Sequence, residues 1–219
     1  SGGIGNAVRD ILVKQKVFHD VMPVGRKTRP KIDLKNEKSI IDLADAIKRR
    51  NRDLRLVVDA TGLLHNKSIF PEKNLRSLTQ EALSENFSVN AIGPILCLKH
   101  LSALFPRVGK SVFVSVSARV GSIGDNHLGG WYSYRASKTA LNQLIKTASI
   151  ELARSLPDHV SIAVHPGTVA TKLSQPFAKE GLKLLTPEDA ATKLWKLIEN
   201  LRSSDTGKFF DNEKRPIPW

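Results

Sequence analysis

A tyrosine and a lysine stand four residues apart in the stretch YSYRASK, residues 132–138. If the stretch is helical, Tyr134 and Lys138 lie one turn apart on the same face. A phenol with its usual pKa near ~10 is a poor acid or base at neutral pH. A neighbouring ammonium favours the phenolate, so Lys138 is expected to lower the pKa of Tyr134. Such a pair could exchange a proton with a carbonyl or alcohol oxygen, although the same spacing also occurs in ordinary surface pairs.

The segments around this pair alternate between strand and helix patterns. Strands are predicted at 18–25, 30–34, 54–62, 110–117, 160–165 and 207–210, and helices at 6–16, 39–50, 79–105, 132–155 and from Thr186 onward. This alternation predicts one α/β domain over residues 1–219, a doubly wound parallel sheet of the Rossmann type with helices on both faces. In such a sheet ligands bind beyond the carboxyl ends of the strands.

Composition narrows the function classes. The net charge of +13 comes from lysines and arginines spread along the chain, and no nucleic-acid module or interleaved aromatic residues accompany them. The hypothesis that the protein binds nucleic acid or a membrane surface therefore rests on charge alone, and neither partner is expected. The absence of a long apolar run argues against a transmembrane span. A single cysteine, Cys97, fits a reducing compartment and a cytoplasmic protein. The scattered histidines predict no metal site.

Four motifs occur together in one order: GGIG, NFSVNAIGP, SARVGSIGDNHLGGWYSYRASKTALN and HPGTVATKL. This constellation resembles the short-chain dehydrogenase/reductase family over essentially the whole chain. Within the family it is most similar to the branch that contains the C-factor signalling protein and the Sniffer-type carbonyl reductases. The resemblance implies a fold that binds a nicotinamide cofactor, which carries out the hydride transfer itself.

The resemblance also implies roles for individual residues. Tyr134 would be the acid/base at the substrate oxygen, and Lys138 would lower its pKa and bind the nicotinamide ribose. Asn90 would hold a water that connects the lysine to solvent, or would simply satisfy backbone groups inside its helix. The positions that would bind the cofactor are Gly3, Ile4, Gly5, Arg26, Asp33, Leu34, Ala60, Thr61, Gly62, Tyr134, Lys138, Pro166, Gly167, Val169 and Thr171.

The sequence departs from the family pattern at two places. Counting back from Gly121 puts Ala118 where the catalytic serine is expected. Ser117 is the expected replacement, with Ser122 as the alternative. The usual Asn-Asn-Ala-Gly after the fourth strand is replaced by the sequence DATG, residues 59–62, which keeps the small residues and loses an amide.

The residues after the second predicted strand bear on the cofactor. That strand is followed by Arg26 and Lys27, with no carboxylate to bind ribose hydroxyls. A guanidinium suits a 2′-phosphate, so NADP is expected in preference to NAD. Asp33 could contact the adenine amino group, or could cap the next helix.

The opening glycines match only the end of a phosphate-binding turn. Gly3 and Gly5 fit its last two glycines, so we expect the first strand of the sheet to lie before Ser1. Apolar residues at Leu128, Trp131, Tyr132 and 173–177 could line a pocket for a hydrophobic carbonyl, or could be ordinary loop packing.

The expected function is NADP(H)-dependent interconversion of a small-molecule carbonyl and an alcohol. The alternative is a regulatory or signalling protein of the same fold that binds NADP(H) with little turnover, an alternative favoured by the altered serine position. By resemblance, a homodimer or homotetramer is expected.

Overall fold

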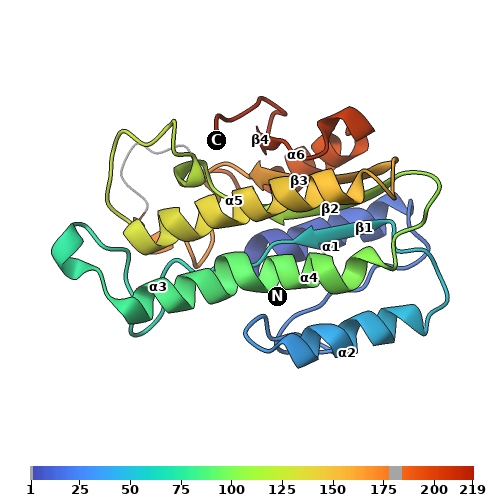
Figure 1. The fold of residues 1–219 in the computed structure, drawn as a ribbon, viewed down its shortest axis with the longest axis horizontal. Coiled ribbons are helices and arrows are strands. Elements are labelled where there is room, and N and C mark those ends of the chain that lie inside the picture. The colour runs from blue at the N-terminus through green and yellow to red at the C-terminus, as the bar shows by residue number, and fades with distance from the viewer. Residues whose placement is uncertain (1, 178–183) are drawn as a thin grey trace.

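The computed structural model describes residues 2–177 and 184–219. It contains a four-stranded parallel sheet in the order β1 (Leu56–Asp59), β2 (Ser111–Val116), β3 (His159–His165) and β4 (Phe209–Asp211) (Figure 1). The strands are in register at their ends: Asp59 lies opposite Ser115, and Val116 opposite Val164. Their carboxyl ends therefore meet at one edge, as the sequence predicts for the ligand side.

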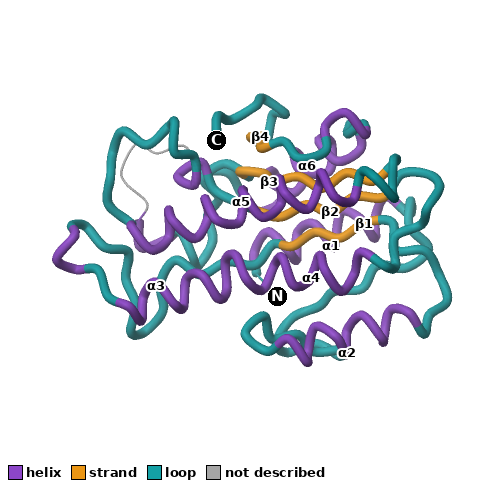
Figure 2. The backbone as a smooth tube through the Cα atoms, viewed as in Figure 1, coloured by secondary structure: helices purple, strands orange, loops and turns teal. Residues whose placement is uncertain are grey.

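Helices cover both faces of the sheet, which confirms the predicted α/β fold (Figure 2). The cause is visible in β2, where successive side chains alternate between faces. Val112 and Val114 pack in a cluster with α1 (Gly3–Gln15) and α6 (Pro187–Glu199). Phe113 packs on the opposite side with α2 (Glu37–Lys48), α4 (Gly93–Ser102) and α5 (Tyr132–Leu152).

The long helix predicted from Thr79 is present but contains an irregular turn. Thr79 caps α3 (Gln80–Phe87) by accepting a hydrogen bond from the Ala82 amide at 3.1 Å. A π-helical turn, Ser88–Ile92, joins α3 to α4. The proline at position 94 has no N–H, so it cannot bond to the carbonyl of Asn90 as a regular helix would require. The predicted break at Gly93-Pro94 is therefore a local π turn and not an end of the helix.

Two strand predictions are wrong. Residues 18–25 and 30–34 form no named strand, and they meet only in an isolated bridge between Gly25 and Lys31. Their apolar side chains, among them Met22, Val24 and Ile32, pack against the cluster around α2 and α4. Burial thus explains the apolar pattern, but among the described residues the backbone finds no neighbouring strand for a ladder.

Thr186 caps α6 through the Asp189 amide, as its sequence predicts. Within residues 2–177 and 184–219, no helix combines the length and apolar character needed to cross a bilayer.

Candidate active site

The tyrosine and the lysine lie together at the start of α5. Tyr134 is 7% exposed and Lys138 is 2% exposed. The Lys138 Nζ lies 5.9 Å from the centre of the Tyr134 ring, and it donates a hydrogen bond to the Val116 carbonyl at 2.8 Å. The four-residue spacing therefore does bring both groups to one face, at the carboxyl end of β2.

Burial dominates the protonation of both groups. It lowers the pKa of Lys138 to about 8, against a weaker opposing effect of the Asp59 carboxylate. It raises the pKa of Tyr134 above its usual value. The net lowering of the Tyr134 pKa expected from Lys138 is not found, because removal of the phenol from water is the larger effect. Tyr134 is a neutral phenol at neutral pH, the form that can donate a proton.

Asn90 connects the π turn to this pair. Its side chain is fully buried, accepts a hydrogen bond from the Leu63 amide at 2.7 Å and donates to the Leu63 carbonyl at 2.8 Å. It also donates to the Ser137 hydroxyl at 3.0 Å, and Ser137 in turn donates to the Tyr134 carbonyl. This network links the π turn to the first turn of α5.

Gly62 is the point where Asn90 and Lys138 approach each other. A Cβ on Gly62 would lie 3.7 Å from the Asn90 Oδ1 and 3.8 Å from the Lys138 Nζ. The structure thus brings together three positions that are widely separated in sequence, each on a different element.

The glycine positions assigned to the cofactor also converge. A Cβ on Gly3 would lie 3.0 Å from the Thr171 methyl, and one on Gly5 would lie 3.6 Å from the Ala60 Cβ. Gly167 has a φ of +84°, and a Cβ there would meet the Asn212 amide at 2.8 Å. The start of α1 therefore lies beside the loops that follow β1 and β3, so a ligand there would contact backbone. Ile4, Thr61, Pro166 and Val169 belong to these same segments.

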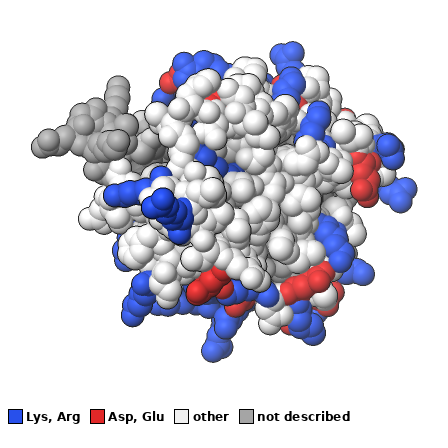
Figure 3. Space-filling model, turned by 60° about the vertical axis from the view of Figure 1, so that its left-hand side comes forward, with Lys and Arg blue, Asp and Glu red and all other residues white. Residues whose placement is uncertain are grey.

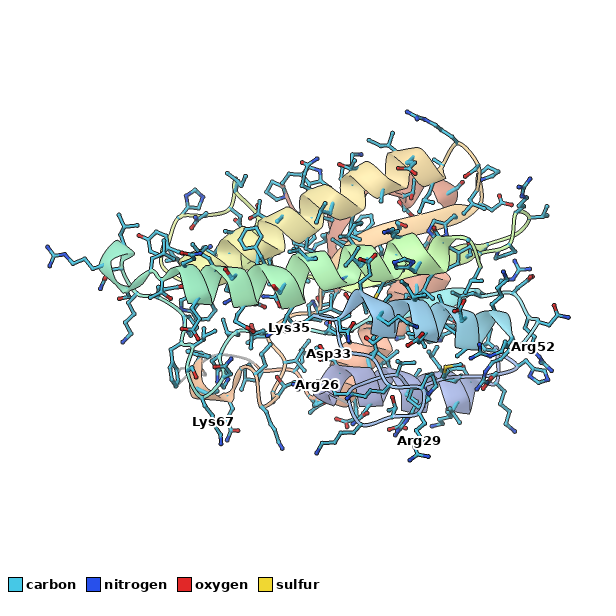
Figure 4. The ribbon with its side chains drawn as sticks, turned by 60° about the horizontal axis from the view of Figure 1, so that its bottom comes forward. Arg26, Arg29, Asp33, Lys35, Arg52 and Lys67 are labelled. Carbon is cyan, nitrogen blue, oxygen red and sulfur yellow. The ribbon has the colours of Figure 1, made fainter. Side chains whose placement is uncertain are left out.

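The residues assigned to the adenosine end lie further out. Arg26 and Lys27 are exposed, and Figure 4 shows Arg26, Asp33 and Lys35 near the ends of α1 and α2. The Asp33 Oδ1 accepts a hydrogen bond from the Lys35 amide at 3.1 Å, which organises the turn before α2. Leu34 packs against Gly93, where a Cβ would approach the Leu34 Cβ to 2.5 Å.

Neither candidate serine points its hydroxyl proton at the tyrosine. Ser117 donates to the Asn142 Oδ1 at 2.7 Å, and Ser122 donates to the Pro218 carbonyl at 2.5 Å. Each hydroxyl can accept a further hydrogen bond, but it must give up its present partner to donate one.

Aromatic rings lie against Tyr134. Trp131 meets it edge-on at 6.2 Å between centres, Phe177 meets Trp131 at 5.2 Å, and His65 meets Phe177 at 5.4 Å. We call these three residues, Trp131, Phe177 and His65, the aromatic wall. Leu128, by contrast, is 92% exposed.

Two buried carboxylates near the site were not expected from sequence. Asp59 accepts hydrogen bonds from the Ser115 hydroxyl at 2.9 Å and from the Thr61 amide at 3.1 Å. Glu72 is 3% exposed and bonds to Ser133 at the start of α5. The departure from the family pattern at Asp59 was a usable signal, whereas Glu72 lies in a loop without a motif.

The arrangement is that of an α/β protein in which the turns carrying Gly3, Gly5, Gly62 and Gly167, which we call the cradle, lie near a buried tyrosine–lysine pair. A family model described as enoyl-(acyl carrier protein) reductase matches residues 10–196. The chain is 31% identical over 202 residues to 1-hydroxy-2-glutathionyl-2-methyl-3-butene dehydrogenase of Rhodococcus sp. (strain AD45), covering 91% of this chain and 84% of that protein. The chain belongs to the short-chain dehydrogenase/reductase family and is an oxidoreductase of that family.

Further similarities agree with the branch inferred from sequence. The C-signal of Myxococcus xanthus is 31% identical over 140 residues, covering 63% of this chain and 78% of that protein. Among solved structures, the carbonyl reductase Sniffer of D. melanogaster superimposes with a TM-score of 0.81 at 20% identity, covering 100% of this chain and 96% of Sniffer. The NADPH-bound carbonyl reductase from chicken fatty liver gives 0.87 at 22% identity, with coverage of 100% and 95%. These structural matches concern the fold.

Proposed function

We propose that the chain is an NADP(H)-dependent oxidoreductase that interconverts an aldehyde or ketone and the corresponding alcohol. The observation that carries the proposal is the buried neutral phenol of Tyr134 beside the Lys138 ammonium, with Asn90 and Gly62 next to that ammonium. A proton donor shielded from water, with a cation to stabilise the anion it leaves, suits protonation of a developing alkoxide.

In reduction, the Tyr134 O–H would donate its proton to the substrate oxygen, while a nicotinamide cofactor, when bound, would be the source of the hydride for the carbonyl carbon. Lys138 stabilises the phenolate that remains. Asn90 would contribute through its main-chain carbonyl, which lacks its regular helical donor because Pro94 has no N–H, and which would accept a hydrogen bond from a water molecule. Protons from solvent would then return to Tyr134 by way of this water and Lys138. In oxidation each step runs in reverse.

The cradle fits a dinucleotide. A Cβ on Gly3 would be tight against the Thr171 methyl, and one on Gly5 would be in ordinary contact with Ala60, so glycine keeps the backbone accessible where it could meet a pyrophosphate. The two ends of the cofactor would be held by the positions named in the sequence analysis, among them Gly62, Pro166 and Gly167.

Arg26 and Lys27 support NADP(H) over NAD(H). Both are exposed beyond Gly25, beside the adenosine end of the cradle, and could contact a 2′-phosphate. Arg26→Ala should reduce the thermal stabilisation given by NADPH and leave that given by NADH unchanged. Arg52→Ala is the matched control, because Figure 4 places Arg52 at the far end of α2. Equal loss with both cofactors, or no loss with NADPH, would refute this selectivity.

The aromatic wall supports an apolar substrate. Trp131 and Phe177 offer flat apolar surface next to the tyrosine that receives the carbonyl. Ser117 would position the carbonyl oxygen, and to donate to it Ser117 must exchange Asn142 for the substrate. The test is oxidation of NADPH with benzaldehyde, acetophenone, hexanal and glucose, of which the first three should be turned over in preference to glucose.

A second function is favoured by one observation. The serine position is occupied by Ala118, and the nearby serine hydroxyls are committed to protein acceptors. A regulatory protein that binds NADPH with little turnover would fit this arrangement. It would be stabilised by NADPH and would show no oxidation of NADPH with any carbonyl of the panel.

Self-association is part of the proposal. The α5 face at Tyr132, Arg135 and Gln143 forms a shallow groove with Ile123, which is 72% exposed. On the face shown in Figure 3, charges lie mostly near the edges and the centre is largely uncharged. Light scattering coupled to size-exclusion chromatography should give a dimer or a tetramer, and a monomer at micromolar concentration would contradict it.

A further inference from the structure

The helix that carries Tyr134 and Lys138 begins without a cap of its own. Its N-cap residue, Trp131, has a φ of 54° and makes no side-chain hydrogen bond to the first turn. The amides of a first helical turn have no partner within the helix, and a buried helix start must find acceptors elsewhere. An acceptor from another element is therefore needed at this point.

Glu72 supplies that acceptor. Its Oε2 accepts from the Ser133 amide at 3.2 Å, and its Oε1 accepts from the Ser133 hydroxyl. Its main-chain carbonyl accepts from the Trp131 amide at 2.5 Å. One residue thus satisfies groups on both sides of Tyr132, at the point where the chain turns into α5.

The contact between Glu72 and Ser133 is buried, and the start of α5 compensates the charge of the carboxylate. Glu72 is 3% exposed and Ser133 is 1% exposed, and Glu72 forms no ion pair among residues 2–177 and 184–219. A buried carboxylate is unfavourable unless donors or positive potential compensate it. The positive end of the α5 dipole and the Ser133 donors provide this compensation.

The loop that carries Glu72 is fixed at two places in the site. Near its start, Leu63 bonds through both backbone groups to the side chain of Asn90. Towards its end, Glu72 holds the start of α5. Between them, the His65 ring meets Phe177 of the aromatic wall edge-on, and its Nε2 lies 3.3 Å from the Lys172 carbonyl. The loop therefore contacts Asn90 at one end, through Leu63, and Ser133, the residue before Tyr134, at the other end, through Glu72.

We propose that Glu72 is a positioning residue for the reaction: its buried carboxylate caps α5 from the neighbouring loop and fixes Tyr134 and Trp131 relative to Asn90. This inference rests on the proposed function. Glu72 touches neither substrate nor cofactor in this role, and it acts through Ser133 and the first turn of the helix.

The test compares Glu72→Gln and Glu72→Ala with Glu81→Ala, which removes an exposed carboxylate from the first turn of α3. The substrate is the carbonyl of the panel with the highest turnover. We expect kcat to fall at least tenfold in Glu72→Ala and less in Glu72→Gln, which keeps one oxygen acceptor. The KM for NADPH and the stabilisation by NADPH should stay within twofold of the wild type, and Glu81→Ala should behave as the wild type.

Ser133→Ala provides a second measurement. If the contact acts through Ser133, its loss should lower kcat in the wild type and have little further effect in Glu72→Ala. Independent effects in the two backgrounds would overturn the proposal. So would an unchanged kcat in folded Glu72→Gln and Glu72→Ala, or a loss of kcat matched by an equal loss of NADPH binding, which indicates general destabilisation.

Hydrogen exchange separates this proposal from the proposed function. In both Glu72 variants the amides of residues 133–135 should exchange faster, while the last turns of α5 stay protected. If the wild type oxidises NADPH with no carbonyl, the proposed function fails, and unchanged exchange at these amides would independently overturn the capping.

Discussion

Gly121 sets how closely the turn after β2 approaches α5, the helix that carries Tyr134 and Lys138. A Cβ at this position would lie 2.8 Å from the Lys138 Cβ and 2.9 Å from the Lys138 carbonyl carbon. Ordinary carbon–carbon contacts lie at about 3.5–4.0 Å, so Gly121→Ala requires a displacement of about 1 Å. The turn cannot retreat freely, because the Gly121 carbonyl accepts from the Thr139 hydroxyl at 2.9 Å and from the Asn142 amide at 3.2 Å.

The expected costs follow from that displacement. Overpacking of this kind destabilises a protein by about 1–3 kcal/mol. A shift of about 1 Å in a catalytic group can cost about 100-fold in rate. We therefore expect Gly121→Ala to remain folded and stabilised by NADPH, with kcat about 100-fold below the wild type.

The matched control is Gly129→Ala. Gly129 has a φ of +64° and nothing within 4 Å of its ideal Cβ, so an alanine there is strained by about 1–2 kcal/mol without pressing on α5. Thermal unfolding and NADPH oxidation are measured on both variants. Comparable stability losses with a rate loss only in Gly121→Ala are expected. A Gly121→Ala enzyme with wild-type kcat would refute the claim that the position of α5 limits the reaction.

Two further predictions concern pH. Because burial lowers the pKa of Lys138 to about 8, kcat/KM for reduction should fall by about tenfold per pH unit above that value. Asp59→Asn should move the midpoint to lower pH, since Asp59 raises that pKa, and a profile that stays flat through this region would contradict a charged lysine. Burial also lowers the pKa of His159 and of His165 from 6.5 to about 4. Between these two pKa values the unfolded chain binds more protons than the folded chain. The free energy of unfolding should therefore fall as pH drops from 6.5 to about 4, by up to about 1.4 kcal/mol per pH unit for each histidine. Urea unfolding measured at several pH values should show that the stability of His159→Gln depends less steeply on pH than that of the wild type. An unchanged pH dependence would refute the lowered pKa of His159.

The elements with strong periodic patterns were predictable from sequence. β2 and β3 are short apolar runs bounded by polar turns, and α6 carries its cap and proline at the expected positions. The strand prediction for residues 18–25 was wrong because an apolar pattern indicates burial, whereas a strand also needs a neighbouring strand for its hydrogen bonds.

The site was predictable only in part. The spacing of Tyr134 and Lys138 fixes their common face, because helix geometry alone determines it. Their pKa values depend on burial and, for Lys138, on the Asp59 carboxylate, and local sequence reveals neither. Glu72 meets Ser133 across 61 positions of the chain, and no spacing rule connects them.

The most direct test of the account is the rate of NADPH oxidation by Tyr134→Phe. Phenylalanine keeps the ring that packs against Trp131 and removes only the hydroxyl. With the preferred carbonyl substrate, kcat should fall by about 100-fold or more, while stabilisation by NADPH stays at the wild-type level. A Tyr134→Phe protein that turns over as fast as the wild type would contradict the assignment of the phenol as proton donor.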